Sequence, residues 1–315
     1  MAALLQHRSI PIVAAFLGGC LSAMQSRMNG QLAIYVGDGL EAALYSFGSG
    51  LVILTILVIV ARPVREGVLR IPAAVRAGGL QWWQVLGGIL GGYFVAVQSA
   101  TVPVLGVAIF MVAVVAGQSG NSLFVDRVGL GPAGKQPITT QRVVSALLAI
   151  AAVALAVSDR LRSGSLSIVA VLFALSAGVL IAVQSAINGR VAREARNPMS
   201  ATFLNFLLGT IALGVAFGVS WAFTDLDPSN PTGAPWWSYL GGMIGIVFIA
   251  IAVWVVPIVG VLMFALSTIA GQLFGALALD LVVPTPGTEV AWNLVAGVLL
   301  AFFAVLVAAR RRHSH

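Results

Sequence analysis

The sequence carries very little charge. Only 9% of its 315 residues are Asp, Glu, Lys or Arg, whereas 59% are hydrophobic, and the mean hydropathy is +1.02. A soluble domain of this length has several times more charged residues on its surface. Cysteine is almost absent: Cys20 is the only one, which excludes an internal disulfide and makes a cysteine-based metal site untenable. The composition indicates an integral membrane protein.

The residue constellations that are typical of catalysis are missing too. All three histidines, His7, His313 and His315, lie near the ends of the chain. No glycine-rich loop followed by Lys and Ser or Thr is present, so nothing in the sequence would hold the phosphates of ATP. We therefore expect no enzyme activity, no cofactor and no metal. The net charge of +7 sits in short loops and at the chain end, which argues against a nucleic-acid partner.

Long apolar runs fill most of the chain. About 20 apolar residues form a helix that crosses a hydrocarbon core of roughly 30 Å, and continuous apolar runs favour helices over alternating strands. We expect Pro103, Pro198 and Pro257 in the first turn of a helix, where a missing N–H is tolerated. The segment 225–235 is predicted to be a loop. The predicted spans are 10–34, 40–61, 80–100, 103–125, 140–158, 165–188, 198–222, 236–255, 257–280 and 290–309.

The basic residues predict the orientation. With the N-terminus in the cytoplasm, 14 of the 17 Lys and Arg residues fall inside, Arg160 and Arg162 fall outside, and Arg27 lies within the first span. Cytoplasmic loops of membrane proteins carry such an excess. We expect a multi-pass protein of the bacterial cytoplasmic (inner) membrane with both termini inside. The basic loops are interpreted as topology determinants, with a lipid-headgroup or partner site as the alternative.

The chain repeats itself. Residues 25–31 (QSRMNGQ) return as residues 184–190 (QSAINGR), and residues 103–118 return at 257–272 with 7 of 16 positions identical. The pair Trp82-Trp83 returns as Trp236-Trp237. Each copy lies in a half of five spans, and an odd number of spans inverts the second half. The predicted fold is an all-α integral membrane protein of ten transmembrane helices, built as two inverted five-helix repeats over residues 1–158 and 159–315.

Glycines spaced four apart mark expected helix contacts. In lipid, helices associate through close backbone contact, which small residues permit. The pairs are Gly87-Gly91, Gly88-Gly92, Gly241-Gly245 and Gly271-Gly275. We expect packing seams at these pairs, some of which could slide during function.

Amide side chains within the spans are the candidates for a substrate cavity. Buried polar groups are costly in a membrane bundle and are therefore functional candidates. Gln25 and Asn29 share one helix face, and Gln184 and Asn188 repeat this pair. They would suit a polar, neutral or zwitterionic solute, or they hold helices together by hydrogen bonds. The further candidates are Gln98, Gln118, Asn121, Asn205 and Gln272.

Three charged residues have alternative roles. Arg27 either extends to the membrane interface or attracts anions at an entrance. Asp126 and Asp280 end the fourth and ninth spans on opposite sides; they either cap helices at the interface or alternate in exposure as a proton carrier. No acidic residue lies in the middle of a predicted span, so the coupling ion, a proton or sodium, is left open.

These motifs resemble the drug/metabolite transporter superfamily, and specifically its YdcZ-like branch of bacterial inner-membrane transporters. The matching residues are Gln25, Asn29, Gly30 and Leu32; Ser46, Phe47 and Gly50; Trp82, Trp83, Leu86, Gly87 and Gly88; and the runs 103–106, 115–118 and 126–130. The resemblance covers nearly the whole chain but is looser in the second half, where Arg190 replaces Gln31. It implies solute movement by alternating access, with export as the direction.

The sequence thus predicts a secondary transporter of a small metabolite or drug-like solute. A lipid or lipid-linked-sugar flippase could use the same fold and would open laterally to the bilayer. A membrane scaffold without flux would have a packed interior. The partners expected are a small-molecule solute, a coupling ion and the lipid bilayer, and the oligomeric state is left open.

Overall fold

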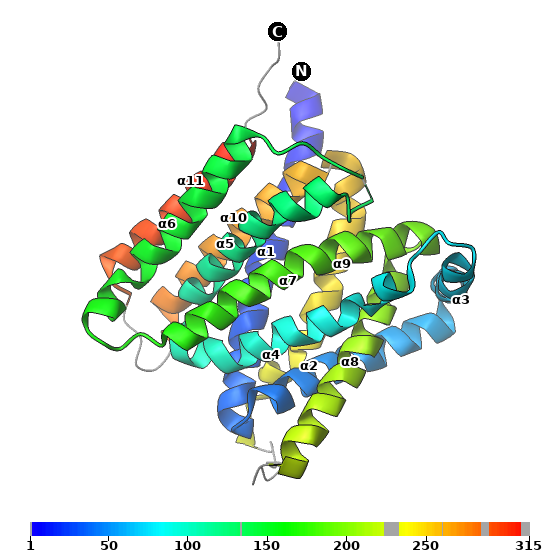
Figure 1. Cartoon of the computed structure of the whole chain (residues 1–315), viewed down its shortest axis with the longest axis horizontal. Helices are drawn as coiled ribbons and strands as arrows, with labels where there is room; N and C mark the ends of the chain where they lie inside the picture. The colour runs from blue at the N-terminus through cyan, green and yellow to red at the C-terminus, as the bar shows by residue number, and fades with distance from the viewer. Residues whose placement is uncertain (1, 133, 224–232, 260, 285–289, 310–315) are drawn as a thin grey trace.

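The computed structural model describes residues 2–132, 134–223, 233–259, 261–284 and 290–309. Its long helices pack into one bundle (Figure 1). They are α1 (Ala2–Val36), α2 (Gly39–Val60), α4 (Gly87–Leu105), α5 (Val107–Val128), α6 (Thr140–Arg162), α7 (Ile168–Ala195), α8 (Pro198–Phe223), α9 (Gly241–Val259), α10 (Val261–Val282) and α11 (Trp292–Ala309). Helix α3 (Arg62–Arg76) and the 3-10 helices η1 (Trp82–Leu86) and η3 (Trp236–Leu240) stand between them.

Most of these helices have the length and composition of membrane spans. Eight of the described helices are long and apolar enough to cross a membrane, and the apolar runs of α9 and α11 are somewhat shorter. A helix rises about 1.5 Å per residue, so about 20 residues match the hydrocarbon core. The described residues form helices and connections but no strands. The chain is therefore an all-helical, multi-pass membrane protein, as its composition predicts.

Two predicted helix starts are wrong. Pro103 and Pro257 lie inside α4 and α9, near the C-terminal ends of these helices, and not in the first turn of the next helix. Helix α4 continues past Pro103 to Gly106, whose φ of +80° turns the chain into α5. This backbone conformation suits glycine, so Gly106 separates the two helices. Pro198 opens α8, as predicted.

Helix α3 was not expected, because the segment after α2 was predicted to be a basic loop. Pro63 falls in its first turn, where proline is tolerated. Val64, Gly67 and Ile71 recur at helical spacing and are buried against α7 and α8, while the arginines lie on the other face. The segment is too short and too polar to be found by a search for membrane spans, but its apolar spacing is that of an amphipathic helix.

Two glycine pairs let helix backbones touch. Gly19 of α1 faces Gly271 of α10, and a Cβ on either would overlap a backbone carbonyl of the other helix. Gly178 of α7 faces Gly117 of α5 in the same way. The predicted seam at Gly271 is thus confirmed, and it has a counterpart between α5 and α7.

A second set of close contacts surrounds α2 and α8. Gly242 of α9 lies against the backbone of Ser46 in α2, and Gly88 of α4 lies against the backbone of Asn205 in α8. Between α2 and α8, Phe47 and Phe206 stack with ring centroids 4.8 Å apart. The seam predicted at Gly88 of α4 is therefore confirmed, whereas the predicted pair Gly241-Gly245 of α9 lies against side chains and not against a helix backbone.

The bundle has a buried centre and two distinct ends. Residues 107–117 of α5 are all buried, and α6 pairs with α11 along one flank (Figure 1). At one end, Arg190 and Arg193 of α7 bind carbonyl groups of the α5–α6 connection, and Ser200 of α8 donates to the carbonyl of Val64 in α3. We call this the basic end. The α1–α2, α4–α5 and α6–α7 turns lie at the opposite end.

We predict that Gly271→Ala lowers the melting temperature of the purified protein by several degrees. The added methyl group would push α10 away from the carbonyl of Phe16, and overpacking of this kind costs about 1–3 kcal/mol. Gly214→Ala in α8 is the matched control, because no atom lies within 4 Å of its added Cβ. It should leave the melting temperature unchanged or raise it, and equal losses in both variants would contradict the seam.

Candidate functional site

A buried amide cluster lies toward the opposite end of the bundle. Asn29 of α1 is fully buried and donates through Nδ2 to Oε1 of Gln98 in α4, at 2.7 Å. Gln98 in turn donates through Nε2 to the hydroxyl of Ser26, at 2.6 Å. This chain of bonds fixes the orientation of the Asn29 amide. Its Oδ1 has no hydrogen-bond partner in the described part of the protein.

Two of the buried polar atoms converge on one glycine. A Cβ on Gly241, the first residue of α9, would overlap Oδ1 of Asn29 and would lie 3.0 Å from Oγ of Ser46 in α2. Among the described residues, Oγ of Ser46 also lacks a hydrogen-bond partner. Buried polar atoms are normally paired, so unpaired ones point to a functional role. They lie where α1 and α2 meet α9.

A second amide cluster lies toward the basic end. Oδ1 of Asn205 in α8 accepts hydrogen bonds from Nε2 of Gln184, at 2.8 Å, and from Nδ2 of Asn188, at 2.9 Å. Asn188 lies against Gly87, and Gln184 lies against Gly91, both on α4. Oε1 of Gln184 is buried without a partner among the described residues. Here α7 and α8 meet α4.

The two clusters have equivalent positions but different partners. Asn29 and Asn188 are 159 residues apart, as are Ser46 and Asn205. Asn29 is held by Gln98 of α4, whereas Asn188 is held by Asn205 of α8. The position 154 residues after Gln98 is Ala252, so the second half has no amide there. Sequence reasoning named all of these amides but could not pair them.

The other predicted amides belong to neither cluster. Gln25 is half-buried and points toward Gly245 of α9. Gln272 donates to the hydroxyl of Ser22 at 3.2 Å, and Asn121 donates to the carbonyl of Val179 at 2.8 Å. Gln118 is half-buried on α5, where its backbone passes Gly178. These four residues lie at helix contacts.

Asp280 holds the junction between α4 and α5. It is 3% exposed, and its two carboxylate oxygens accept the backbone N–H groups of Val107 and Ala108 at 3.1 and 2.7 Å. A carboxylate at a helix N-terminus satisfies unpaired N–H groups and the helix dipole. Arg27 and Arg160 act on it electrostatically and donate to the nearby carbonyls of Pro284 and Val104.

Asp126 is the residue of the first half that corresponds to Asp280, and its surroundings differ. It is about one-third exposed at the basic end and forms an ion pair with Arg142 at the start of α6. Of the two aspartates that sequence reasoning proposed, one therefore caps a buried helix and the other forms an ion pair that is about one-third exposed. Among the described residues, no three His, Cys, Asp or Glu side chains gather in a way that could hold a metal ion.

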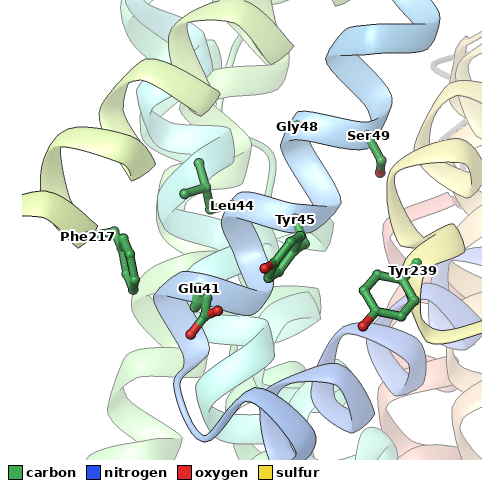
Figure 2. Close-up of a pocket in the computed structure, with 7 residues that line it drawn as sticks. All are labelled: Glu41, Leu44, Tyr45, Gly48, Ser49, Phe217 and Tyr239. Carbon is green, nitrogen blue, oxygen red and sulfur yellow. The ribbon is translucent and has the colours of Figure 1, made fainter. Parts of the chain in front are cut away.

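A cavity opens beside α2 (Figure 2). Its volume is about 380 Å³, and it lies between α2, α8 and η3. None of the residues predicted from the sequence lines it. The lining residues are Glu41, Leu44, Tyr45, Gly48, Ser49, Phe217 and Tyr239.

Glu41 is the residue that sequence reasoning missed. It lies in the first turn of α2 and is 5% exposed, although it carries a carboxylate. Unlike Asp126 and Asp280, it has no acidic counterpart at the equivalent position of the other half, which is Ser200. The available signal was an acidic residue at the start of an apolar span with Tyr45 four residues later, which places both on one helix face.

Comparisons with known proteins agree with this architecture. A protein-family model described as "Putative inner membrane exporter, YdcZ" matches the chain in two regions, residues 10–155 and 169–307. A solved structure described only as "Crystal structure of protein" is similar over 98% of this chain and 99% of that chain, with a TM-score of 0.53 and 18% sequence identity. That likeness concerns the fold alone. No curated protein matches the chain.

We predict that Asp280→Ala destabilises the protein more than Asp126→Ala does. Loss of the Asp280 carboxylate leaves two buried N–H groups of α5 unpaired, which costs about 1–3 kcal/mol or more. A partly exposed ion pair such as that of Asp126 is worth less than about 1 kcal/mol. Thermal unfolding in detergent compares the two variants. Equal destabilisation would show that Asp280 does not hold the α4–α5 junction.

Proposed function

We propose that this chain, which belongs to the YdcZ family, is a secondary transporter that exports a small metabolite or drug-like solute. The family expected from the sequence motifs is the family whose model matches, and its description as an inner membrane exporter supports a membrane transporter rather than an enzyme. The mechanism that we infer is alternating access between two halves, residues 1–158 and 159–315.

Reciprocal contacts support two inverted repeats. The contact of Gly19 with Gly271 has its counterpart in the contact of Gly178 with Gly117. Gly178 lies 159 residues after Gly19, and Gly271 lies 154 residues after Gly117, which are the offsets of the sequence repeat. Phe47 and Phe206, themselves 159 residues apart, stack on each other, as residues near a two-fold axis would. The family model also matches the chain once in each half. Five helices per half give the inverted topology that many secondary transporters share.

The basic end is proposed to face the cytoplasm. It holds the described arginines of α3, Arg127 and Lys135 at and after the end of α5, and the arginines at the end of α7. This distribution follows the positive-inside rule and places both termini in the cytoplasm. The opposite end then faces the periplasm. We infer coupling to a proton or sodium gradient, because the sequence has no loop for ATP.

One observation carries the mechanism. Asn29 of the first half lies on Gly241 of the second half, and Asn188 of the second half lies on Gly87 of the first. Each of these two contacts between the halves therefore pairs an amide side chain of one half with a glycine of the other half. Separation at one end would expose Asn29 and Gln98, and separation at the other end would expose Gln184, Asn188 and Asn205.

The two ends differ in how far they are closed. Asn29, Gln98 and Ser26 are almost completely buried, whereas Asn188 and Asn205 are half-buried. Asp280 additionally ties α10 to the start of α5 at the end that holds Asn29. These contacts support a state in which the periplasmic end is closed and the cytoplasmic end is the more accessible one.

We predict that a bulky label that holds one end of the bundle open closes the other end. Cys20 is the only cysteine, so Cys20→Ala gives a background for single labels. Gly48→Cys places a thiol in open space at the cavity, and Leu207→Cys is its counterpart 159 residues later. In proteoliposomes, modification of Gly48→Cys with a bulky, membrane-impermeant maleimide should slow the labelling of Leu207→Cys from the other side several-fold.

The control for this experiment is a label outside the bundle. Ser163→Cys lies in the exposed α6–α7 turn at the same end as Gly48. Its modification should leave the labelling rate of Leu207→Cys unchanged. If the bulky label at Gly48→Cys has no effect on the labelling rate of Leu207→Cys, the bundle is static, as expected of a membrane scaffold.

A further inference from the structure

We propose that the outer face of α3 binds the phosphate groups of anionic lipids at the basic end of the bundle. This inference goes beyond the proposed transport function and does not depend on it, because it concerns a contact between the protein and the bilayer. Three observations carry it: the position of α3 between two membrane spans, the surplus of arginine on its outer face, and an exposed leucine among these arginines.

Helix α3 lies at the edge of the bundle, at the level where the spans end (Figure 1). Ile59 and Val60 in the last turn of α2 are exposed, and Arg62 follows two residues after Val60. On the other side of α3, Trp82 and Trp83 are exposed just before α4 begins. Exposed apolar side chains of a span face the lipid tails, whereas exposed tryptophans gather at the level of the lipid headgroups. Both ends of α3 are therefore held near the membrane surface.

The inner face of α3 is fixed to the protein, and the outer face carries positive charge. Val64 and Ile71 are buried against α7 and α8. At 3.6 residues per turn, Arg62, Arg65 and Arg76 fall within about 60° of one another around the helix axis, away from the buried pair. All three arginines are exposed. Burial of the inner face thus turns this row of arginines outward.

Positive charge exceeds negative charge on α3. Its 15 residues contain four arginines and one glutamate, a net charge of +3. Glu66 forms ion pairs with Arg62 at 2.7 Å and with Arg70 at 3.5 Å, and Arg65 donates to the carbonyl of Ile59 at 3.2 Å. A guanidinium has five N–H donors, so an arginine in such a contact retains donors for a phosphate. The surplus charge attracts an anionic partner even though several of the arginines have contacts within the protein.

An exposed leucine favours a lipid as the partner over a soluble acidic protein. Leu69 is 69% exposed and lies on the same helix face as Arg62 and Arg65. Helices at a membrane surface combine apolar side chains that enter the boundary of the acyl chains with basic side chains that reach the headgroups. Arginine also matches the geometry of a phosphate, because its planar guanidinium can donate two parallel hydrogen bonds.

The charge of α3 has no counterpart in the second half of the sequence. In the repeat, the connection that corresponds to α3 is the segment 224–235, which contains two aspartates and no basic residue. A repeated chain that carries four arginines in one connection and none in the other is suited to an anionic lipid surface at one end only.

The test is native mass spectrometry of the purified full-length protein in a non-ionic detergent. The protein is titrated with dioleoylphosphatidylglycerol and, separately, with dioleoylphosphatidylcholine. The two lipids share their acyl chains and a phosphate, but only the first has a net negative charge. We expect phosphatidylglycerol to bind about tenfold more tightly than phosphatidylcholine. Combined Arg65→Gln and Arg76→Gln should lower this preference to about threefold or less, because each basic residue near a membrane surface adds to the attraction for anionic lipid.

Matched variants separate α3 from the general charge of the protein. Combined Arg127→Gln and Lys135→Gln also removes two exposed positive charges, outside α3, and should change the preference less than about twofold because these residues lie off the proposed surface. Combined Arg65→Lys and Arg76→Lys keeps the charge and should retain most of the preference. The melting temperature of each lipid-free variant shows that it is folded.

Three outcomes would overturn the proposal. The first is equal affinity of the unmodified protein for the two lipids. The second is an equal loss of preference in the α3 glutamine pair and in the control pair, which would assign the effect to overall charge. The third is an equal loss in the lysine and glutamine variants of α3, which would show that positive charge on this face does not bind the lipid.

Discussion

Direct contact between helix backbones is the constraint on which the rest of the structure depends. In a bilayer the lipid tails are as apolar as leucine, so helices gain little from burying apolar side chains against one another. They gain instead from close packing, which glycine permits. At Gly19 and Gly271, and again at Gly178 and Gly117, the neighbouring backbones fill the space that a Cβ would need. These seams fix α1 against α10 and α7 against α5, and thereby place each amide cluster.

The polar groups are arranged differently in the two proposed halves. Asn29 and Asn188 occupy equivalent positions against equivalent glycines, but one is bound by Gln98 and the other by Asn205. Glu41 and its tyrosines occur at one end only. In the proposed mechanism, two similar halves would give two similar ways of opening, and the differences in side chains would give each end its own chemistry. The proposed transporter needs both properties, because it would alternate and would also recognise its solute.

Sequence reasoning predicted the helices and their packing better than the arrangement of the candidate functional site. The apolar spans and the seam at Gly271 follow from apolar length and small-residue spacing, which are local properties of the chain. Helix α3 was missed because its apolar face is short, and Pro103 was misplaced because the positive φ of Gly106 sets the helix boundary. The pairing of Asn29 with Gln98, and the cavity around Glu41, depend on which helices meet in three dimensions. No spacing rule contains that information.

The most direct test of the account measures whether the two ends open in turn. Pulsed electron paramagnetic resonance would give the distances between spin labels in a cysteine-free background. One pair, Tyr35 and Gly233, reports on the opposite end; the equivalent pair, Glu194 and Gly79, reports on the basic end. The account predicts both a short and a long distance between the labels of each pair. Asp280→Asn weakens the closure of the opposite end, so it should lengthen the Tyr35–Gly233 distance and shorten the Glu194–Gly79 distance. Single, unchanging distances, or two pairs that lengthen together, would contradict alternation between the two halves.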